Sequence, residues 1–251
     1  ERDVLSLTES ELARVRGSVA SIVFQDSLGS LNPSIRVERQ VAEAITAHES
    51  GDQRSAMARA HMSLSHVGFP LDRATAYPHQ LSGGLRQRVA IAIATACRPK
   101  LLIADEPTTA LDVTVQAQIL TLLRSLADEL GLGVLLITHD LGVVATIADR
   151  VTVMYGGRTV EACSVTDVFA TPAHPYSDAL VRSAPSLDDD RDLVLRGIPG
   201  QPPDPRTPEP GCPFEPRCDR RRAECSHGPI PLTVNGAERM LACLNPVISH
   251  G

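Results

Sequence analysis

Short runs of consecutive apolar residues recur along the chain, separated by segments in which hydrophobic positions have helical spacing. Residues 19–24 form a short run that predicts a strand. Residues 101–104 and 134–138 form continuous runs bounded by polar residues, which are typical of parallel strands buried on both faces of a sheet. Between the last two runs, residues 113–129 carry apolar side chains at helical spacing: Val115, Ile119, Leu122, Leu123 and Leu126. The pattern therefore predicts a strand–helix–strand unit with the right-handed crossover of parallel α/β folds.

Helical segments are predicted before this unit. Residues 1–18 are polar and helix-prone, and residues 37–66 are rich in alanine with few helix breakers. Ser82 is a suitable N-cap for a helix over residues 83–97, because its side-chain oxygen can accept from a backbone N–H of the first turn.

The second half of the chain has a different character. Residues 151–155 and 158–162 predict a β-hairpin that turns at Gly156 and Gly157. After residue 187 an acidic triplet, Asp188 to Asp190, leads into a proline-rich stretch, which is typical of a linker or an extended segment.

Composition narrows the class of protein. The 251 residues, of which 43% are hydrophobic and 22% charged, suit a globular chain with one sizeable core. A net charge of -6 argues against a nucleic-acid partner, in spite of the basic run at residues 220–222. No apolar run reaches the roughly 20 residues of a membrane span, and the polar opening is unlike a signal peptide.

Two acidic residues and a histidine follow predicted strands. Asp105 and Glu106 end one strand and His139 follows the next, at the edge where open parallel sheets place their chemistry. Phosphoryl transfer needs a carboxylate that holds Mg²⁺ and a group that orients the attacking water. We assign the first role to Asp105 and the second to Glu106, and we expect His139 to contact a terminal phosphate. Without the other motifs, an Asp-Glu pair after an apolar run would be more typical of a solvated strand end.

A second set of residues is suited to anion binding. Ser82, Gly83 and Gly84 open a helix, where backbone N–H groups and the helix dipole can face a phosphate. The phosphate-cradling loop Gly-x-x-x-x-Gly-Lys-Ser/Thr occurs nowhere in the sequence. The chain therefore carries motifs for hydrolysis without the usual loop that grips the phosphates.

These runs together resemble the ABC-type ATPases. Residues 81–87 look like the signature motif, residues 101–107 like the Walker B strand, and residues 137–140 like the switch-histidine segment. The resemblance implies a P-loop NTPase-like parallel sheet with a helical subdomain, ATP and Mg²⁺ as cofactors, and catalytic roles for Glu106 and His139. It also implies that the signature motif completes the nucleotide site of a second ATPase subunit or domain.

Further segments are similar to one subfamily, the importer ATPases for oligopeptides, dipeptides and nickel. The matching segments are 24–27, 30–33, 77–80, 174–176 with a helix to Ser186, and 197–200. By this resemblance Gln25 is a Mg²⁺ and water ligand that senses the membrane subunits. Asp105 and Asp112 belong with Gln25, Ser82, Gly83 and Gly84 to the expected nucleotide-binding set.

The subfamily resemblance predicts three parts and a set of partners. Residues 1–165 would be a partial ATPase domain, 166–210 a helix and proline-rich linker, and 211–251 a cysteine-rich extension. Expected partners are the second ATPase, two membrane permeases and an extracytoplasmic peptide-binding protein, with the chain at the cytoplasmic face of the membrane. We expect the absent phosphate loop to precede residue 1.

Three other functions stay open at this stage. The chain could be a non-catalytic half that contributes only its signature motif, or the ATPase of a nickel importer. A soluble ABC ATPase of DNA repair or translation is disfavoured by the acidic charge and by the importer-like tail.

Four cysteines lie close together near the C-terminal end, separated by five, six and seventeen residues: Cys212, Cys218, Cys225 and Cys243. Disulfides are disfavoured in a reducing cytosol, and structural zinc usually uses tighter cysteine pairs. Spacing alone leaves zinc (Zn²⁺) and an iron–sulfur cluster equally open. The similarity of residues 211–218 to the tail motif of peptide-importer ATPases implies a four-iron (4Fe–4S) cluster, which we expect to be structural.

Overall fold

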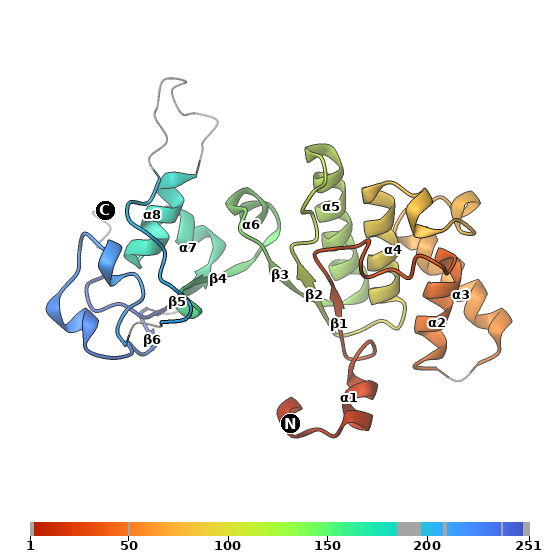
Figure 1. The fold of residues 1–251 in the computed structure, drawn as a ribbon, viewed down its shortest axis with the longest axis horizontal. Coiled ribbons are helices and arrows are strands. Elements are labelled where there is room, and N and C mark those ends of the chain that lie inside the picture. Colours follow the sequence, from red (N-terminus) through yellow and green to blue (C-terminus); the bar gives the residue numbers. More distant parts are fainter. Residues whose placement is uncertain (1–2, 50, 185–196, 208–209, 237, 248–251) are drawn as a thin grey trace. The chain divides into compact units, whose positions relative to one another are not determined.

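The protein is described by a computed structural model that covers residues 3–49, 51–184, 197–207, 210–236 and 238–247 (Figure 1). It divides into two compact units, residues 1–139 and residues 140–251, each of which is described by itself. The start of the predicted linker at Asp188–Asp190 and the end of the predicted helix at Ser186 lie outside the described residues. The predicted three-part division at residues 165 and 210 stays a prediction.

The first unit contains the predicted parallel sheet. Its strands are β1 (Ala20–Val23), β2 (Leu101–Asp105) and β3 (Gly133–Ile137), hydrogen-bonded in the order β1-β2-β3. Helix α5 (Val113–Leu130) connects β2 to β3, which confirms the predicted strand–helix–strand unit. Register pairs Val23 with Ala104 and Asp105 with Ile137, so the carboxyl ends of the three strands lie at one edge.

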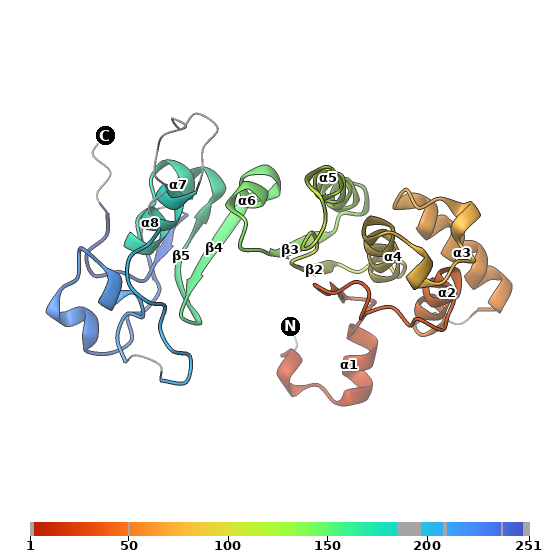
Figure 2. The same cartoon turned by 45° about the horizontal axis from the view of Figure 1, so that its top comes forward.

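A helical subdomain accompanies the sheet, as predicted. It comprises α2 (Val37–Thr46), α3 (Gln53–His66) and α4 (Gly83–Thr95), and both views show α4 between the sheet and the other two helices (Figures 1 and 2). Buried aliphatic side chains fill the space between the helices, among them Val41, Leu64 and Ile91. Burial of this apolar surface holds the subdomain together.

Among the residues that the structure describes, one face of this sheet stays partly exposed, which corrects the prediction from its apolar runs. Leu102 and Ala104, which lie on one face of β2, are fully buried. By the register of the strands, Ile22, Leu135 and Ile137 lie on the opposite face, where they are 40%, 51% and 46% exposed. Figure 2 shows the ribbon of α5 along one side of the sheet.

The remaining short helices lie in the connections. The first unit begins with α1 (Glu9–Val15), closed at its start by a capping box between Thr8 and Glu11. Single turns of 3-10 helix occur at Val4–Ser6, Leu71–Arg73, Pro78–Gln80, Glu215–Arg217 and Ala223–Ser226. None of the helices in the described ranges has the length and apolar character that a membrane crossing requires.

The second unit is built on an antiparallel sheet. Its strands are β4 (Arg150–Tyr155), β5 (Arg158–Ser164), β6 (Thr233–Val234) and β7 (Met240–Leu241), in the order β4-β5-β7-β6. Strands β4 and β5 form the predicted hairpin, and Gly156 and Gly157 take φ values of 55° and 76° at its turn. Positive φ at both turn residues is the geometry that a tight two-residue hairpin needs and that glycine supplies. Helices α6 (Leu141–Ile147), α7 (Val165–Ala170) and α8 (Pro175–Ser183) complete the unit.

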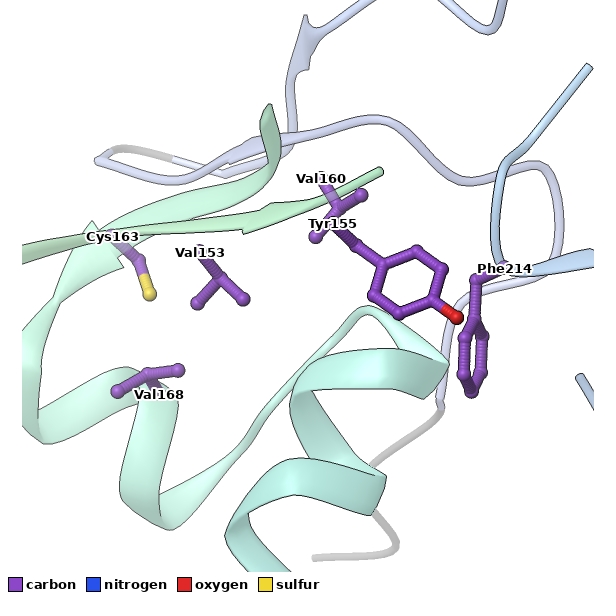
Figure 3. Packing of buried hydrophobic residues seen from close by; sticks show 6 residues of the cluster. All are labelled: Val153, Tyr155, Val160, Cys163, Val168 and Phe214. Carbon is purple, nitrogen blue, oxygen red and sulfur yellow. The ribbon is translucent and has the colours of Figure 1, made fainter. Parts of the chain in front are cut away.

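The cysteine-rich tail shares one hydrophobic core with this hairpin. Figure 3 shows the cluster of buried side chains: Val153, Tyr155, Val160, Cys163, Val168 and Phe214. The ring of Phe214 from the tail meets Tyr155 of β4 edge-on, with ring centroids 5.3 Å apart. Since β7 also pairs with β5, the tail is part of the folded unit rather than an appendage.

A buried carboxylate anchors α8 to the hairpin. Glu161 of β5 is fully buried and accepts hydrogen bonds from the backbone N–H of Ala173 at 3.0 Å and of His174 at 2.9 Å. The Nε atom of Arg239 lies 3.5 Å from the same carboxylate. Backbone donors and a guanidinium therefore replace the water that this charge has lost.

We predict that Glu161→Ala destabilises the chain by about 3–5 kcal/mol, because it leaves Arg239 and two backbone donors without their buried partner. Chemical denaturation of the full chain measures the effect. Glu238→Ala is the matched control: Glu238 forms an exposed ion pair with Arg150, so its loss costs at most about 1 kcal/mol. Equal effects of the two substitutions would show that Glu161 is not the anchor.

Candidate functional site

The carboxylate of Glu106 is the centre of a hydrogen-bonded network at the edge of the parallel sheet. Nδ1 of His139 lies 2.9 Å from Oε1, and Nε2 of Gln25 donates to Oε2 at 2.9 Å. The hydroxyl of Thr109 donates to the same Oε2 at 2.8 Å. The structure thus joins three of the predicted site residues, which come from segments that follow β1, β2 and β3.

The backbone fixes this position as well. Glu106 has a φ of 43°, a left-handed conformation that is uncommon for a residue with a side chain. Its N–H donates to the carbonyl of Ile137 at 2.9 Å, so β2 is still bound to β3 where the chain turns. The turn directs the residue after the strand out of the sheet, and strained backbone of this kind is frequent at functional sites.

Hydrogen bonding changes the acidity of this group. The pKa of Glu106 lies below its ordinary value, first because of the hydrogen bond with His139 and then because of that from Thr109. The Glu106 side chain is 24% exposed and that of His139 is 80% exposed. The site therefore holds an ionised carboxylate that water and ligands can reach.

Asp105 lies next to this network as the last residue of β2, in register with Ile137. Its predicted Mg²⁺ role, for which a carboxylate oxygen is the appropriate ligand, stays a prediction. His139 uses Nδ1 for Glu106, which leaves Nε2 as the ring atom available to a phosphate.

The signature residues occupy a different part of the unit. Ser82 is the N-cap of α4, and its Oγ accepts from the N–H of Leu85 at 3.4 Å. A Cβ added at Gly84 would lie 2.6 Å from Cγ1 of Val115. Glycine is therefore needed where the start of α4 meets the start of α5.

Asp112 caps the neighbouring helix. Its Oδ1 accepts from the N–H of Val115 at 3.0 Å and satisfies one of the free donors at the start of α5. No interaction among the described residues links Asp112, Ser82, Gly83 or Gly84 to Glu106. Their predicted nucleotide contacts stay predictions.

Thr109 is a functional candidate that the sequence motifs did not single out. Thr109 lies three residues after Glu106, and its N–H donates to the Glu106 carbonyl at 3.1 Å. This turn brings the Thr109 hydroxyl back to the Glu106 carboxylate. A hydroxyl three residues beyond an acidic strand end was the available signal.

The four tail cysteines face one cavity in the second unit. Cys212, Cys218, Cys225 and Cys243 line a small cavity that is partly open to solvent. Burial raises the pKa of Cys243 to about 11, and its three cysteine neighbours add to the rise. Burial also raises the pKa of Cys212 and of Cys218. All four are free thiols. Across the described ranges, no group of three or more His, Cys, Asp or Glu side chains is arranged to hold a metal ion.

Comparison with known families and proteins gives matches over both units. Residues 3–109 match the ABC transporter family, and residues 160–225 match the family described as the oligopeptide/dipeptide transporter, C-terminal region. The oligopeptide transport ATP-binding protein OppD of Salmonella typhimurium is 48% identical over 98% of this chain and 73% of its own length. AppD of Bacillus subtilis, described in the same words, is 44% identical over 97% of this chain and 74% of its own length.

Solved structures agree with this assignment. The chain resembles the ATP-binding cassette MJ0796, solved as a dimer bound to ADP and Pi, with a TM-score of 0.56 and 30% identity over 64% of this chain and 68% of that one. It also resembles cbiO1 from Clostridium perfringens, part of the ABC transporter complex cbiONQ, with a TM-score of 0.59 and 32% identity over 65% of this chain and 64% of that one. The chain therefore belongs to the ABC transporter ATP-binding proteins, in the family that includes the oligopeptide transport ATP-binding proteins.

Proposed function

We propose that this chain is the ATP-hydrolysing subunit of an ABC importer for oligopeptides or dipeptides. The observation that carries the proposal is the Glu106 carboxylate held by Gln25, Thr109 and His139. The match to the oligopeptide/dipeptide transporter region, and relatives named for oligopeptide transport, support a peptide as the transported solute rather than nickel.

The network suits the activation of a water molecule. An ionised Glu106 can accept a proton from the attacking water, and Gln25 and Thr109 hold its Oε2 so that the carboxylate keeps one orientation. His139 holds Oε1 through Nδ1 and is placed to contact the terminal phosphate through Nε2. Asp105 would hold Mg²⁺, which supplies neutralisation of phosphate charge when it is bound with ATP.

The signature residues would act on a nucleotide held by another subunit. The N–H groups at the start of α4, behind Ser82, Gly83 and Gly84, are suited to a phosphate, which supports a role of these residues in a composite site. A second ATPase subunit or domain, two permeases and an extracytoplasmic peptide-binding protein would complete the importer. The chain would then lie at the cytoplasmic face of the membrane, bound through the permeases.

We predict that Glu106→Gln lowers the rate of ATP hydrolysis by about 10²- to 10⁴-fold, because it removes the base while keeping the shape of the side chain. Phosphate release by the transporter assembled with its permeases, at saturating ATP, measures the effect. The matched control is Glu129→Gln, at an exposed position near the end of α5, which should leave the rate unchanged.

An unchanged rate in Glu106→Gln would instead support a non-catalytic subunit that contributes only its signature motif. Gly84→Ala then tests the signature role by itself, since an added Cβ would displace the start of α4 from Val115. A non-catalytic subunit would still depend on that residue.

We predict that Thr109→Val raises the pKa of Glu106 toward its ordinary value. The hydroxyl donor stabilises the charged carboxylate, so its removal lets the carboxyl take up a proton at higher pH. Carbon-13 NMR of glutamate-labelled chain measures the pKa, and the acid limb of the hydrolysis rate should move to higher pH. Thr121→Val, on the exposed side of α5, should change neither quantity. A shift of equal size in both variants would contradict the proposed role of the Thr109 hydroxyl.

We further propose that Cys212, Cys218, Cys225 and Cys243 hold a 4Fe–4S cluster. The support is that four thiols from separate segments line one cavity and that burial raises the pKa of at least three of them. Thiolates in such a place need a compensating cation, and Cys₄ is the ligand set of these clusters. The similarity of residues 211–218 to the tail motif of peptide-importer ATPases favours iron–sulfur over Zn²⁺ in this proposal.

Iron and acid-labile sulfide analysis of the anaerobically purified chain tests the cluster. We expect about four iron and four sulfide per chain with visible absorption, both lost in Cys218→Ser. Cys97→Ser is the matched control, because that thiol lies in the first unit and bonds to the carbonyl of Ala44. Stoichiometric zinc without visible absorption would contradict the assignment.

A further inference from the structure

His174 is a buried histidine. One of its ring nitrogens has a hydrogen-bond partner, and the other has none among the described residues. The residue is 1% exposed and is the N-cap of α8. Its Nδ1 accepts a hydrogen bond from the N–H of Tyr176 at 3.0 Å, and its own N–H donates to Glu161. The backbone and one ring nitrogen are thus fixed by the fold.

The cap determines where the ring proton lies. An Nδ1 that accepts from a backbone N–H carries no proton, so the neutral ring carries its proton on Nε2. That atom is buried and has no hydrogen-bond partner in the part of the chain that the structure describes. A buried N–H without a partner is destabilising, so an acceptor supplied by a bound group would remove that penalty.

His174 also lines the cavity of the four cysteines. His174 and Pro175 contribute to its wall beside Cys212, Cys218, Cys225 and Cys243. The ring lies against Phe214, with centroids 6.2 Å apart, so packing in the core of the second unit restricts its orientation. The residue that carries the unsatisfied donor therefore lines the same cavity as the four thiols.

We propose that His174 is a positioning residue that donates its Nε2–H to a sulfur of the group bound by the four cysteines. The inference rests on the proposed iron–sulfur cluster. His174 is not itself a ligand to iron, because a ligating Nε2 would place the proton on Nδ1, where it would face the N–H of Tyr176. An N–H donated to sulfur stabilises the more negative, reduced form of a cluster and so raises its reduction potential.

Other charged groups also line the cavity. The positive charges of Arg220 and Arg221 favour the reduced form, whereas the carboxylate of Glu215 opposes it, and all three influence the potential whether or not His174 donates. The test must therefore change the donor at Nε2 and leave these side chains in place.

Two substitutions separate the two nitrogens of His174. In His174→Asn the amide oxygen can replace Nδ1 as the helix cap, but no donor reaches the position of Nε2. In His174→Gln the amide N–H can reach that position, while the cap is lost. We expect His174→Asn to disfavour cluster reduction about tenfold, which is about 59 mV for a one-electron couple, and His174→Gln to stay near the parent value.

Redox titration of the anaerobically prepared full chain measures the potential, and iron and sulfide content is recorded for each variant. A cluster present at the parent potential in His174→Asn would overturn the inference and leave the cluster proposal standing. A parent chain without iron and sulfide would overturn both.

A measurement on the parent chain covers the case in which a variant fails to fold. Pulsed electron paramagnetic resonance of the reduced cluster in chain labelled with ¹⁵N-histidine should show a hyperfine coupling to one imidazole nitrogen through the N–H···S bond. A spectrum without any ¹⁵N coupling would overturn the inference.

Discussion

The hydrogen bonds of the Glu106 carboxylate join the segments that follow the three strands of the parallel sheet. Each partner of the network comes from a segment that follows a different strand: Gln25 after β1, Glu106 and Thr109 after β2, and His139 after β3. Residues 25 and 139 are far apart in sequence and meet only because parallel pairing aligns the strand ends. A one-residue slip of β2 would turn its buried face outward and move Glu106 away from both. The register of the sheet is therefore a requirement of the site.

Much of the first unit could be predicted because its signals are local. Continuous apolar runs indicated the strands, Ser82 and its glycines indicated the start of α4, and the residues after the strands indicated the site. Whether a sheet face is covered is not a local property. The apolar side chains Ile22 and Leu135 have the composition of buried residues, yet whether they are buried depends on which segments pack over them.

In the second unit, too, the local sequence did not show which segments pack together. Cysteine spacing indicated a ligand set, but it could not reveal that Phe214 packs on Tyr155 or that β7 joins β5. These contacts join segments separated by a proline-rich stretch, and nothing in the local sequence specifies which strand receives the tail. The role of His174 was hidden for a related reason. A histidine before a proline indicates a helix start, and only the three-dimensional structure shows that its second nitrogen is buried without a partner among the described residues and that the residue lines the cysteine cavity.

Two carboxylates in this protein accept similar hydrogen bonds and are suited to opposite tasks. Glu161 is fully buried, and its oxygens are occupied by backbone N–H groups and approached by Arg239, so the loss of these partners would disrupt the second unit. Glu106 is held by side chains alone and remains partly exposed, with a highly exposed His139 beside it. A side-chain network can exchange a partner for water or phosphate without loss of the fold, whereas a backbone network cannot. The exposure of Glu106 is thus what allows its carboxylate to take part in proton transfer, and the register of β1, β2 and β3 is what keeps that exposed group in place.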